Sequence, residues 1–498
     1  MDKLSVIFPQ VKINLDTQNI TFDTLEQMVF DITRQVGGRV LENTLRDMDQ
    51  KLKDERPRGT LENTGKRTKV LMTRLGDIRY ERTRYIDNET KKARYLLEEK
   101  LGLKENQRMS LIRMKIEMFI ASITTYRATK ENVELIMGVR RSHESIRQSV
   151  LKESDRLIVH EAESIRKTKY LEDKAPEALS DIAYLEADSA FIRFQGRRKK
   201  RQSTKLTAKP RRKKRRSLEI KLGIGYTGRV SRYKEGARLA QVLQNKFIHA
   251  DIASGAKFME DLSLIAEKRL SLSKTKAVIF GGDGARWIQN GIEDNFVNAT
   301  YVLCRFHLWR NLKRALSHRL DDHKPLKTLI ETNHIDEALK RISAWVKKPK
   351  DLKEKKDLTA LYAYLRANRN SINSLERIQD KEIKAKVKGT GAIESNVDKF
   401  IAHRMKKRGM SWSLKGALAL LKVKEKILNK EWDSWWIVDR NQKIDSQPKA
   451  WQTLTSKNFW KKERGVTSIL EAEIPALQSR DQNKPWAKVL RELQEAKF

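Results

Sequence analysis

The stretch AVIFGGDGARWI, residues 277–288, constrains the fold more than any other part of this sequence. Its four leading apolar residues predict a buried strand, two glycines and an aspartate follow, and the pattern then becomes helical. A buried carboxylate is costly unless it is paired or binds a cation. The sequence therefore predicts that Asp283 meets a partner from a distant part of the chain.

Composition limits the class of protein. The 498 residues, 39% of them hydrophobic, predict a folded chain of about two to four domains. A net charge of +40 predicts a polyanionic partner, nucleic acid before a ribosomal or anionic membrane surface. The single cysteine, Cys304, excludes an internal disulfide and a cysteine-rich zinc finger. The start of the chain does not resemble a signal peptide and no apolar run approaches membrane-spanning length, so we expect a cytoplasmic protein.

The first part of the chain has a helical pattern interrupted by a hairpin. Residues 1–110 predict a helical N-terminal region with a basic hairpin around Leu75, Gly76 and Asp77, where apolar and polar residues alternate. Residues 111–170 predict a helix-turn-helix DNA-binding region.

The helix-turn-helix prediction depends on one turn. A helix ends near Met137, Gly138 makes the turn, and Ser142 caps the next helix. On that helix Ile146, Val150 and Leu151 would pack inward. The side chains expected to face DNA are His143, Arg147 and Gln148. Ordinary helical domains contain similar helix pairs, so a purely structural interpretation also stays open.

A strand and a basic run follow. Residues 182–195 alternate as a strand and place Glu186 and Asp188 on one face. Residues 197–216 then hold 13 Lys or Arg in 20 positions, and a second strand begins directly after them. Such a run could be a solvated loop or a nuclear address, but confined like charges favour a grip on phosphates. The expected DNA contacts are Arg197, Arg198, Lys199, Lys200, Arg211, Arg212, Lys213, Lys214, Arg215 and Arg216.

The remaining pattern predicts one interrupted α/β domain. A strand around residues 237–247, an amphipathic helix and the strand before Asp283 complete the first part of the domain, residues 178–308. Residues 309–388 predict an all-helical insertion. Residues 389–425 return to the domain with the helix that carries Glu394, and residues 426–498 form a Trp-rich helical tail. The expected fold class is therefore α+β and multidomain.

The partners expected for Asp283 could be two further acidic residues. Asp188, Asp283 and Glu394 are separated by 95 and 111 residues, so only the tertiary fold could bring them together. Carboxylates at close range raise one another's pKa, and Mg²⁺ or Mn²⁺ would relieve that conflict. Two ions about 3.5–4 Å apart would serve phosphodiester chemistry. The competing interpretation is that Asp283 merely caps the helix that follows it.

The segments YLEADSAFIRFQ, AVIFGGDGARWI, YVLCRFHLWRNL and GAIESNVDKFIAHRMKKRGMSWS, in this order, resemble the DDE transposases of bacterial insertion sequences. The likeness is to the ISLre-type family, which is allied to the mutator-like transposases, and it extends over nearly the whole chain. It implies a ribonuclease-H-like catalytic core interrupted by a helical insertion. It also implies that Asp188, Asp283 and Glu394 are the catalytic residues and hold two Mg²⁺ or Mn²⁺ ions.

Four further residues are expected to support the three carboxylates or to contact DNA near them. Cys304 and His307 match the Cys-x-x-His pair of mutator-like enzymes, but two ligands are too few for zinc, so we expect support of the metal site or DNA contact. Glu186 would assist metal binding, support the ligands from outside, or simply face solvent. Arg404, in HRMKKR, would contact DNA phosphates near the site.

The expected function is metal-dependent DNA cleavage at insertion-sequence ends and strand transfer into target DNA. The partners would be double-stranded DNA, as terminal inverted repeats and target, and further copies of the chain in a homodimer or larger assembly. The protein would be associated with the bacterial nucleoid. The alternatives are a ribonuclease-H-like nuclease or resolvase, and a DNA-binding protein without catalysis.

Overall fold

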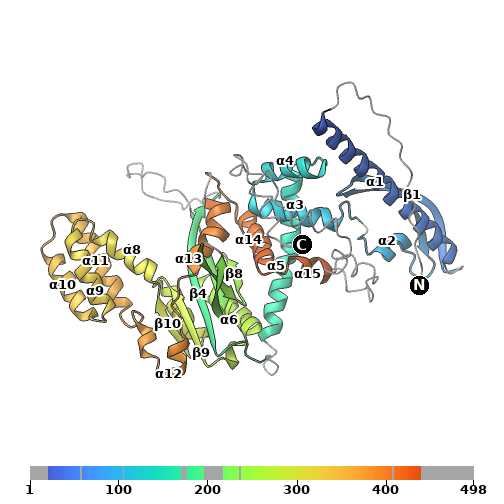
Figure 1. Ribbon diagram of the computed structural model, residues 1–498. Helices are drawn as coiled ribbons and strands as arrows, with labels where there is room; N and C mark the ends of the chain where they lie inside the picture. The colour runs from blue at the N-terminus through green and yellow to red at the C-terminus, as the bar shows by residue number, and fades with distance from the viewer. Residues whose placement is uncertain are drawn as a thin grey trace, which may run out of the picture. The chain divides into compact units, whose positions relative to one another are not determined.

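The computed structural model describes residues 21–56, 59–104, 106–169, 177–195, 217–234, 237–406 and 409–438. The chain divides into two compact units. The first comprises Met1–Val150 and Glu431–Phe498, and the second Leu151–Lys430. Each unit combines helices with β-strands (Figure 1). The expected α+β, multidomain class is therefore confirmed, whereas the finer domain division stays a prediction.

The first unit is built on a long helix and a hairpin. Helix α1 (Phe22–Glu55) packs on strands β1 (Leu61–Thr73) and β2 (Gly76–Asp87), and the short β3 (Ala93–Arg94) extends the sheet. The Asp49 carboxylate of α1 accepts hydrogen bonds from the backbone N–H and the hydroxyl of Thr83 in β2. Strands β1 and β2 pair antiparallel up to Thr73 and Gly76, which confirms the hairpin predicted around Leu75.

Shorter helices complete the first unit: α2 (Leu96–Leu101), α3 (Leu111–Ile123), α4 (Tyr126–Met137), the start of α5 (His143–Lys169) and α15 (Trp432–Val438). Gly138 ends α4 at a φ of +61°, a left-handed conformation that favours glycine. The Ser142 hydroxyl accepts the Ser145 N–H at 3.1 Å, so the predicted cap is confirmed. Ile146, Val150 and Leu151 are buried as expected.

The second unit contains a five-stranded mixed sheet with the order β10-β9-β4-β5-β8. Strand β4 (Ile182–Arg193) is central. It pairs antiparallel with β5 (Ser217–Tyr226), which pairs antiparallel with β8 (Phe247–Asp251). On its other side β4 runs parallel to β9 (Ala277–Gly282), which runs parallel to β10 (Ala299–Leu303).

The strand predicted over residues 237–247 is wrong in its extent. Strand β7 (Ala237–Gln244) pairs with β6 (Gly228–Lys234) in a separate hairpin, and the chain enters β8 only at Phe247. Asn245 lies between the two strands at a φ of +49°. This left-handed residue breaks the extended backbone, and an asparagine tolerates that conformation better than most residues do.

Helices cover both faces of the central strand. Leu185 and Ala187 of β4 belong to a core cluster with Phe258 and Leu262 of α6 (Gly255–Leu270) and with α7 (Arg286–Asn295). Because side chains alternate along a strand, Glu186 points to the opposite face, where it contacts the start of α13 (Ile393–Val397). Helix α13 continues as a π-helical segment, Asp398–Lys406, and α14 (Leu414–Leu428) follows.

Helix α14 protects an edge of the sheet. Asn429, directly after α14, accepts the Ile248 N–H and donates to the Ile248 carbonyl, both at 2.8 Å. The Glu425 carboxylate accepts the Ala250 N–H at 3.1 Å. These side chains satisfy backbone groups of β8 that face away from β5, which keeps an exposed strand edge from pairing with another chain.

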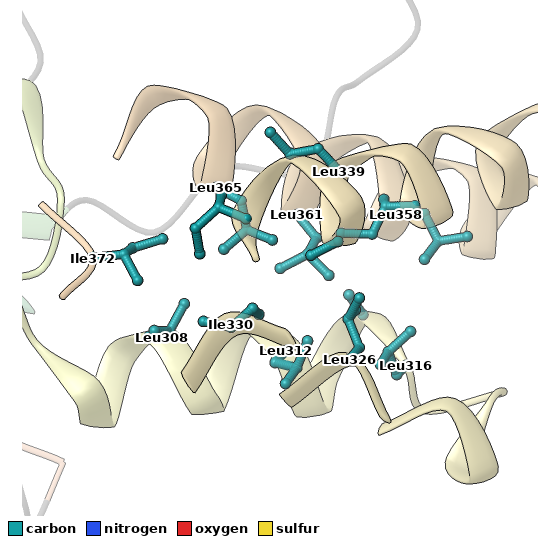
Figure 2. Close-up of a cluster of buried hydrophobic side chains, with 14 of the residues drawn as sticks. Leu308, Leu312, Leu316, Leu326, Ile330, Leu339, Leu358, Leu361, Leu365 and Ile372 are labelled. Carbon is teal, nitrogen blue, oxygen red and sulfur yellow. The ribbon is translucent and has the colours of Figure 1, made fainter. Parts of the chain in front are cut away.

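The region between β10 and α13 is helical, as predicted. It contains α8 (Arg305–Ala315), α9 (Leu320–Glu331), α10 (Ile335–Lys347), α11 (Leu352–Ala367), a 3₁₀ turn (Ser374–Arg377) and α12 (Lys381–Lys386). Figure 2 shows Leu308 and Leu312 of α8 facing Leu361 and Leu365 of α11. The bundle therefore has an apolar core of its own. Among the described residues, no helix is long and apolar enough to span a bilayer.

Candidate active site

Two predicted carboxylates lie on neighbouring strands, Asp188 in the central strand β4 and Asp283 directly after the end of β9. The parallel register pairs Ala187 of β4 with Gly282 of β9, so Asp188 and Asp283 follow at adjacent positions. Asp188 is only 6% exposed, and its Oδ1 accepts the Ser189 N–H at 2.7 Å. Burial raises the pKa of Asp283, and the negative charge of Asp188 raises it further. The site therefore disfavours the ionised form of Asp283.

The backbone at Asp283 is fixed by distant tyrosines. Gly284 adopts a φ of +93° and donates its N–H to the Tyr301 hydroxyl at 2.9 Å. The Tyr364 hydroxyl of α11 donates to the Asp283 carbonyl at 3.0 Å. The N-cap of α7 is Ala285, and Asp283 Oδ1 accepts the Ala285 N–H at 2.9 Å. Asp283 thus makes an Asx turn ahead of the helix and is not its N-cap.

Glu394 lies near Asp188, with the imidazole of His307 between the two carboxylates. The His307 Nε2 atom lies 2.5 Å from Glu394 Oε1 and 3.6 Å from Asp188 Oδ2. Cys304 Sγ lies 3.5 Å from the same Glu394 oxygen. The Cys304 N–H donates to the Gly282 carbonyl at 2.7 Å, which ties the start of α8 to the end of β9. The imidazole of His307 therefore bridges two of the three carboxylates.

The geometry indicates where His307 carries its proton. Arg310 Nη2 lies 2.9 Å from His307 Nδ1, and because a guanidinium only donates, Nδ1 must accept. The ring proton then sits on Nε2 and faces Glu394. Burial by itself lowers the pKa of His307, but the nearby Asp188 and Glu394 carboxylates raise it to about 9. The carboxylates therefore favour a doubly protonated ring and the Arg310 donor opposes it, while Nε2 lies against Glu394 without meeting hydrogen-bond geometry.

The Cys-x-x-His pair gains a third possible ligand in the structure. Donor atoms of Cys304, His307 and Glu394 lie within 4.8 Å of one another. Burial raises the pKa of the Cys304 thiol to about 12, and the Glu394 charge adds to that effect. A structural zinc site usually takes four such ligands. The supporting roles predicted for Cys304 and His307 stay predictions.

Two further predicted residues have defined surroundings. Glu186 is 1% exposed, and its carboxylate accepts hydrogen bonds from the backbone just before Glu394. Arg404 is 2% exposed, with its guanidinium 4.9 Å from the centre of the Trp412 ring and Nη1 3.2 Å from Met410 Sδ. Arg404 therefore packs inside the second unit, and its predicted DNA contact stays a prediction.

The predicted base-reading side chains lie at the start of α5. His143 and Gln148 are exposed and Arg147 is partly exposed. Arg147 pairs with Glu144 at 2.7 Å, Gln148 donates to the same carboxylate at 2.8 Å, and these contacts lower the pKa of Glu144 to about 2. DNA would have to compete with that carboxylate. The basic run 197–216 lies outside the described residues.

Sequence reasoning missed several residues of the site. Arg310 stands three positions after His307 on one helix, and that spacing could have identified it. Tyr364 carried no local signal, because it lies in another helix of the insertion. A second buried cluster was also missed. Donor atoms of Glu161, His249 and Glu425 lie within 4.8 Å of one another, and Lys422 pairs with both glutamates.

The protein is thus a multidomain α+β protein with buried carboxylates at the centre of a mixed sheet. Residues 15–433 match the Uncharacterised protein family UPF0236, and the chain belongs to that family. A UPF0236 protein of Caldanaerobacter subterraneus subsp. tengcongensis is 22% identical over 82% of this chain and 77% of its own length. A UPF0236 protein in the vanSb 3′ region of Streptococcus gallolyticus is 21% identical over 70% of each chain.

Proposed function

We propose that this protein is a DDE-type DNA transposase with a ribonuclease-H-like core. The observation that carries the proposal is the meeting of Asp188 and Asp283 on adjacent parallel strands, with Glu394 joined to Asp188 through His307. Three antiparallel strands followed by two parallel ones, in the order β8-β5-β4-β9-β10, support the proposed core. The helical bundle between Asp283 and Glu394 fits the insertion that such relatives carry.

The residues present fit a divalent metal site. The raised pKa of Asp283 reflects burial and the Asp188 charge, and both penalties fall when a cation is bound. Carboxylate oxygens are the ligands that Mg²⁺ and Mn²⁺ prefer. Asp188, Asp283 and Glu394 would hold two such ions, which activate the attacking oxygen and stabilise the leaving oxygen in phosphodiester chemistry.

The surrounding side chains would orient the glutamate. The His307 Nε2 atom lies against the Glu394 carboxylate, and Arg310 would hold the imidazole in that orientation through Nδ1. Cleavage would free a 3′-hydroxyl at the element end, and the same carboxylates would then serve its attack on target DNA. No covalent intermediate with the protein is required.

Charge and the relatives support DNA as the substrate. A net charge of +40 suits a protein that binds terminal repeats and target DNA together, as a homodimer or larger assembly at the nucleoid. The names of three relatives from Caldanaerobacter join eleven, four and two designations, respectively. We interpret several designations for one protein as repeated gene copies, which a self-copying element would leave.

The test is a cleavage and strand-transfer assay with the full-length protein. The probe is a labelled duplex from the DNA that flanks the gene, with Mg²⁺ or Mn²⁺ against EDTA. We expect metal-dependent nicking and a joined product for the wild type, neither for Asp283→Ala, and unchanged activity for Asp294→Asn, an exposed carboxylate on α7.

The other outcomes identify the alternatives. Metal-dependent cleavage without joined product would favour a ribonuclease-H-like nuclease or resolvase. DNA binding without cleavage under any metal condition would favour a non-catalytic DNA-binding protein. Activity that persists in alanine variants of Asp188, Asp283 and Glu394 would overturn the catalytic assignment.

A further inference from the structure

Glu186 holds the segment that precedes Glu394. Its carboxylate accepts the backbone N–H groups of Gly391 at 2.9 Å, Ala392 at 3.2 Å and Ile393 at 2.9 Å. The Tyr226 hydroxyl of β5 donates a fourth hydrogen bond at 2.7 Å. With 1% exposure, this carboxylate has exchanged water for a complete set of protein donors.

These contacts replace a missing helix cap. The N-cap residue of α13 is Ala392, which has no side-chain capping hydrogen bond. The first N–H groups of a helix have no partner within the helix, and an anion placed there gains from charge-assisted hydrogen bonds. Here the anion comes from the central strand of the sheet, more than 200 positions away in the chain. One carboxylate therefore fixes both the start of α13 and its distance from β4.

Residues in and after β5 stabilise the negative charge of Glu186. Arg229 Nη2 lies 3.7 Å from Glu186 Oε1 and donates to the Tyr226 hydroxyl at 3.1 Å. Tyr226 itself stacks on Tyr184 with ring centres 5.1 Å apart. The Tyr184 hydroxyl accepts the Lys388 N–H at 2.9 Å. The segment from Lys388 to Ile393 is therefore bound to β4 at both of its ends.

We propose that Glu186 is a positioning residue that sets the place of Glu394 relative to Asp188. The neighbouring side chains on one face of β4 would then divide the work: Asp188 binds metal, and Glu186 holds the backbone of the third ligand. This inference rests on the proposed function, because it assumes that Glu394 is a metal ligand. Partners that orient metal ligands typically affect metal affinity by about 10–100-fold.

The test compares Glu186→Gln with the wild type in two measurements on the full-length protein. Glutamine keeps the volume but replaces one acceptor oxygen by a donor, which would face backbone N–H groups. We expect hydrogen exchange of the Gly391, Ala392 and Ile393 amides to accelerate by about 10-fold or more. We expect Mn²⁺ affinity, measured by electron paramagnetic resonance, to fall by about 10–100-fold.

Two further variants keep the test interpretable. Tyr226→Phe removes only one of the four hydrogen bonds, so it should weaken Mn²⁺ binding less than Glu186→Gln and covers the case in which the latter fails to fold. Glu354→Gln alters an equally buried carboxylate, which binds Arg319 in the helical bundle, and should leave Mn²⁺ affinity unchanged.

The outcomes separate this inference from the proposed function. Unchanged amide exchange in Glu186→Gln, or faster exchange with unchanged Mn²⁺ affinity, overturns the positioning role alone. A wild type that binds no Mn²⁺ overturns the proposed metal site and the positioning role with it, while the exchange rates still report whether Glu186 anchors the segment.

Discussion

At the scale of single residues, Asp283 is a carboxylate whose ionised form its surroundings disfavour. It is partly buried beside Asp188, its backbone is held by Tyr301 and Tyr364, and its pKa is raised by burial and by the Asp188 charge. The hydrogen bond from the Ala285 N–H favours the ionised carboxylate, but burial and the Asp188 charge outweigh it. This balance supports the proposed role of Asp283 as a metal ligand.

Asp283→Asn is expected to separate stability from activity. Removing the negative charge relieves the repulsion from Asp188, so the free energy of unfolding should stay the same or rise by up to about 1 kcal/mol. Metal-dependent cleavage should fall by more than about 100-fold, because a proposed ligand is lost. Urea unfolding and the cleavage assay measure the two effects, with Asp294→Asn as the matched control. A clear loss of stability would favour a structural role for the carboxylate.

His249 gives a prediction for pH. Burial lowers its pKa, but the carboxylates of Glu425 and Glu161 outweigh burial and the charge of Lys422, and raise the pKa to about 9. The protonated imidazole therefore stabilises the fold fully below pH 6.5, and this contribution is lost as the pH rises through 9. We expect the wild type to lose about 2–3 kcal/mol more than His249→Gln between pH 6 and pH 10 in urea unfolding. Parallel pH profiles would contradict this explanation.

At the scale of elements, the two glycines that end β9 leave room for side chains packed against the strand. A Cβ atom on Gly281 would lie 2.9 Å from the Thr390 Cβ atom, and one on Gly282 would lie 3.1 Å from Ile288 and Tyr301. Gly281 pairs in register with Glu186. The strand can therefore approach the segment before Glu394 only because it lacks a side chain at this position.

Gly281→Ala should displace that segment. The clash falls on Thr390, close to the backbone that Glu186 holds, so we expect metal-dependent cleavage to fall by about 10–100-fold with DNA binding unchanged. The double variant Gly281→Ala/Thr390→Gly removes the clash and should recover most of the activity. The cleavage assay and fluorescence anisotropy measure both properties. Equal defects in the single and the double variant would show that the clash is not the cause.

At the scale of the whole molecule, we expect the excess of positive charge to determine how tightly the protein would bind DNA. Each phosphate contact contributes about 0.9 to the slope of log affinity against log salt concentration. Replacing Arg211, Arg212 and Lys213 with serine should lower the slope by about 2–3 if the basic run grips phosphates. The control variant removes the same number of positive charges by replacing three exposed lysines of α11, Lys353, Lys355 and Lys356, with serine. Equal slopes in both variants would show that net charge matters and the run does not.

Much of the local structure could be predicted. The end of α4 at Met137, the turn at Gly138 and the cap at Ser142 follow from residue preferences that act within a few positions. The alternation in β4 correctly placed Glu186 and Asp188 on one face. The break at Asn245 was missed, because apolar residues continue on both sides of it and only the pairing partners change.

The sequence by itself determined the classes of element, the α+β organisation and the excess of positive charge, since each depends on composition or on short periodic patterns. Only the tertiary structure decided which side chains meet. His307 approaches Glu394, Tyr364 holds Asp283, and Glu186 caps α13 across separations of 81 to more than 200 positions. Such contacts arise from strand register and helix packing, which leave no local trace in the order of the residues.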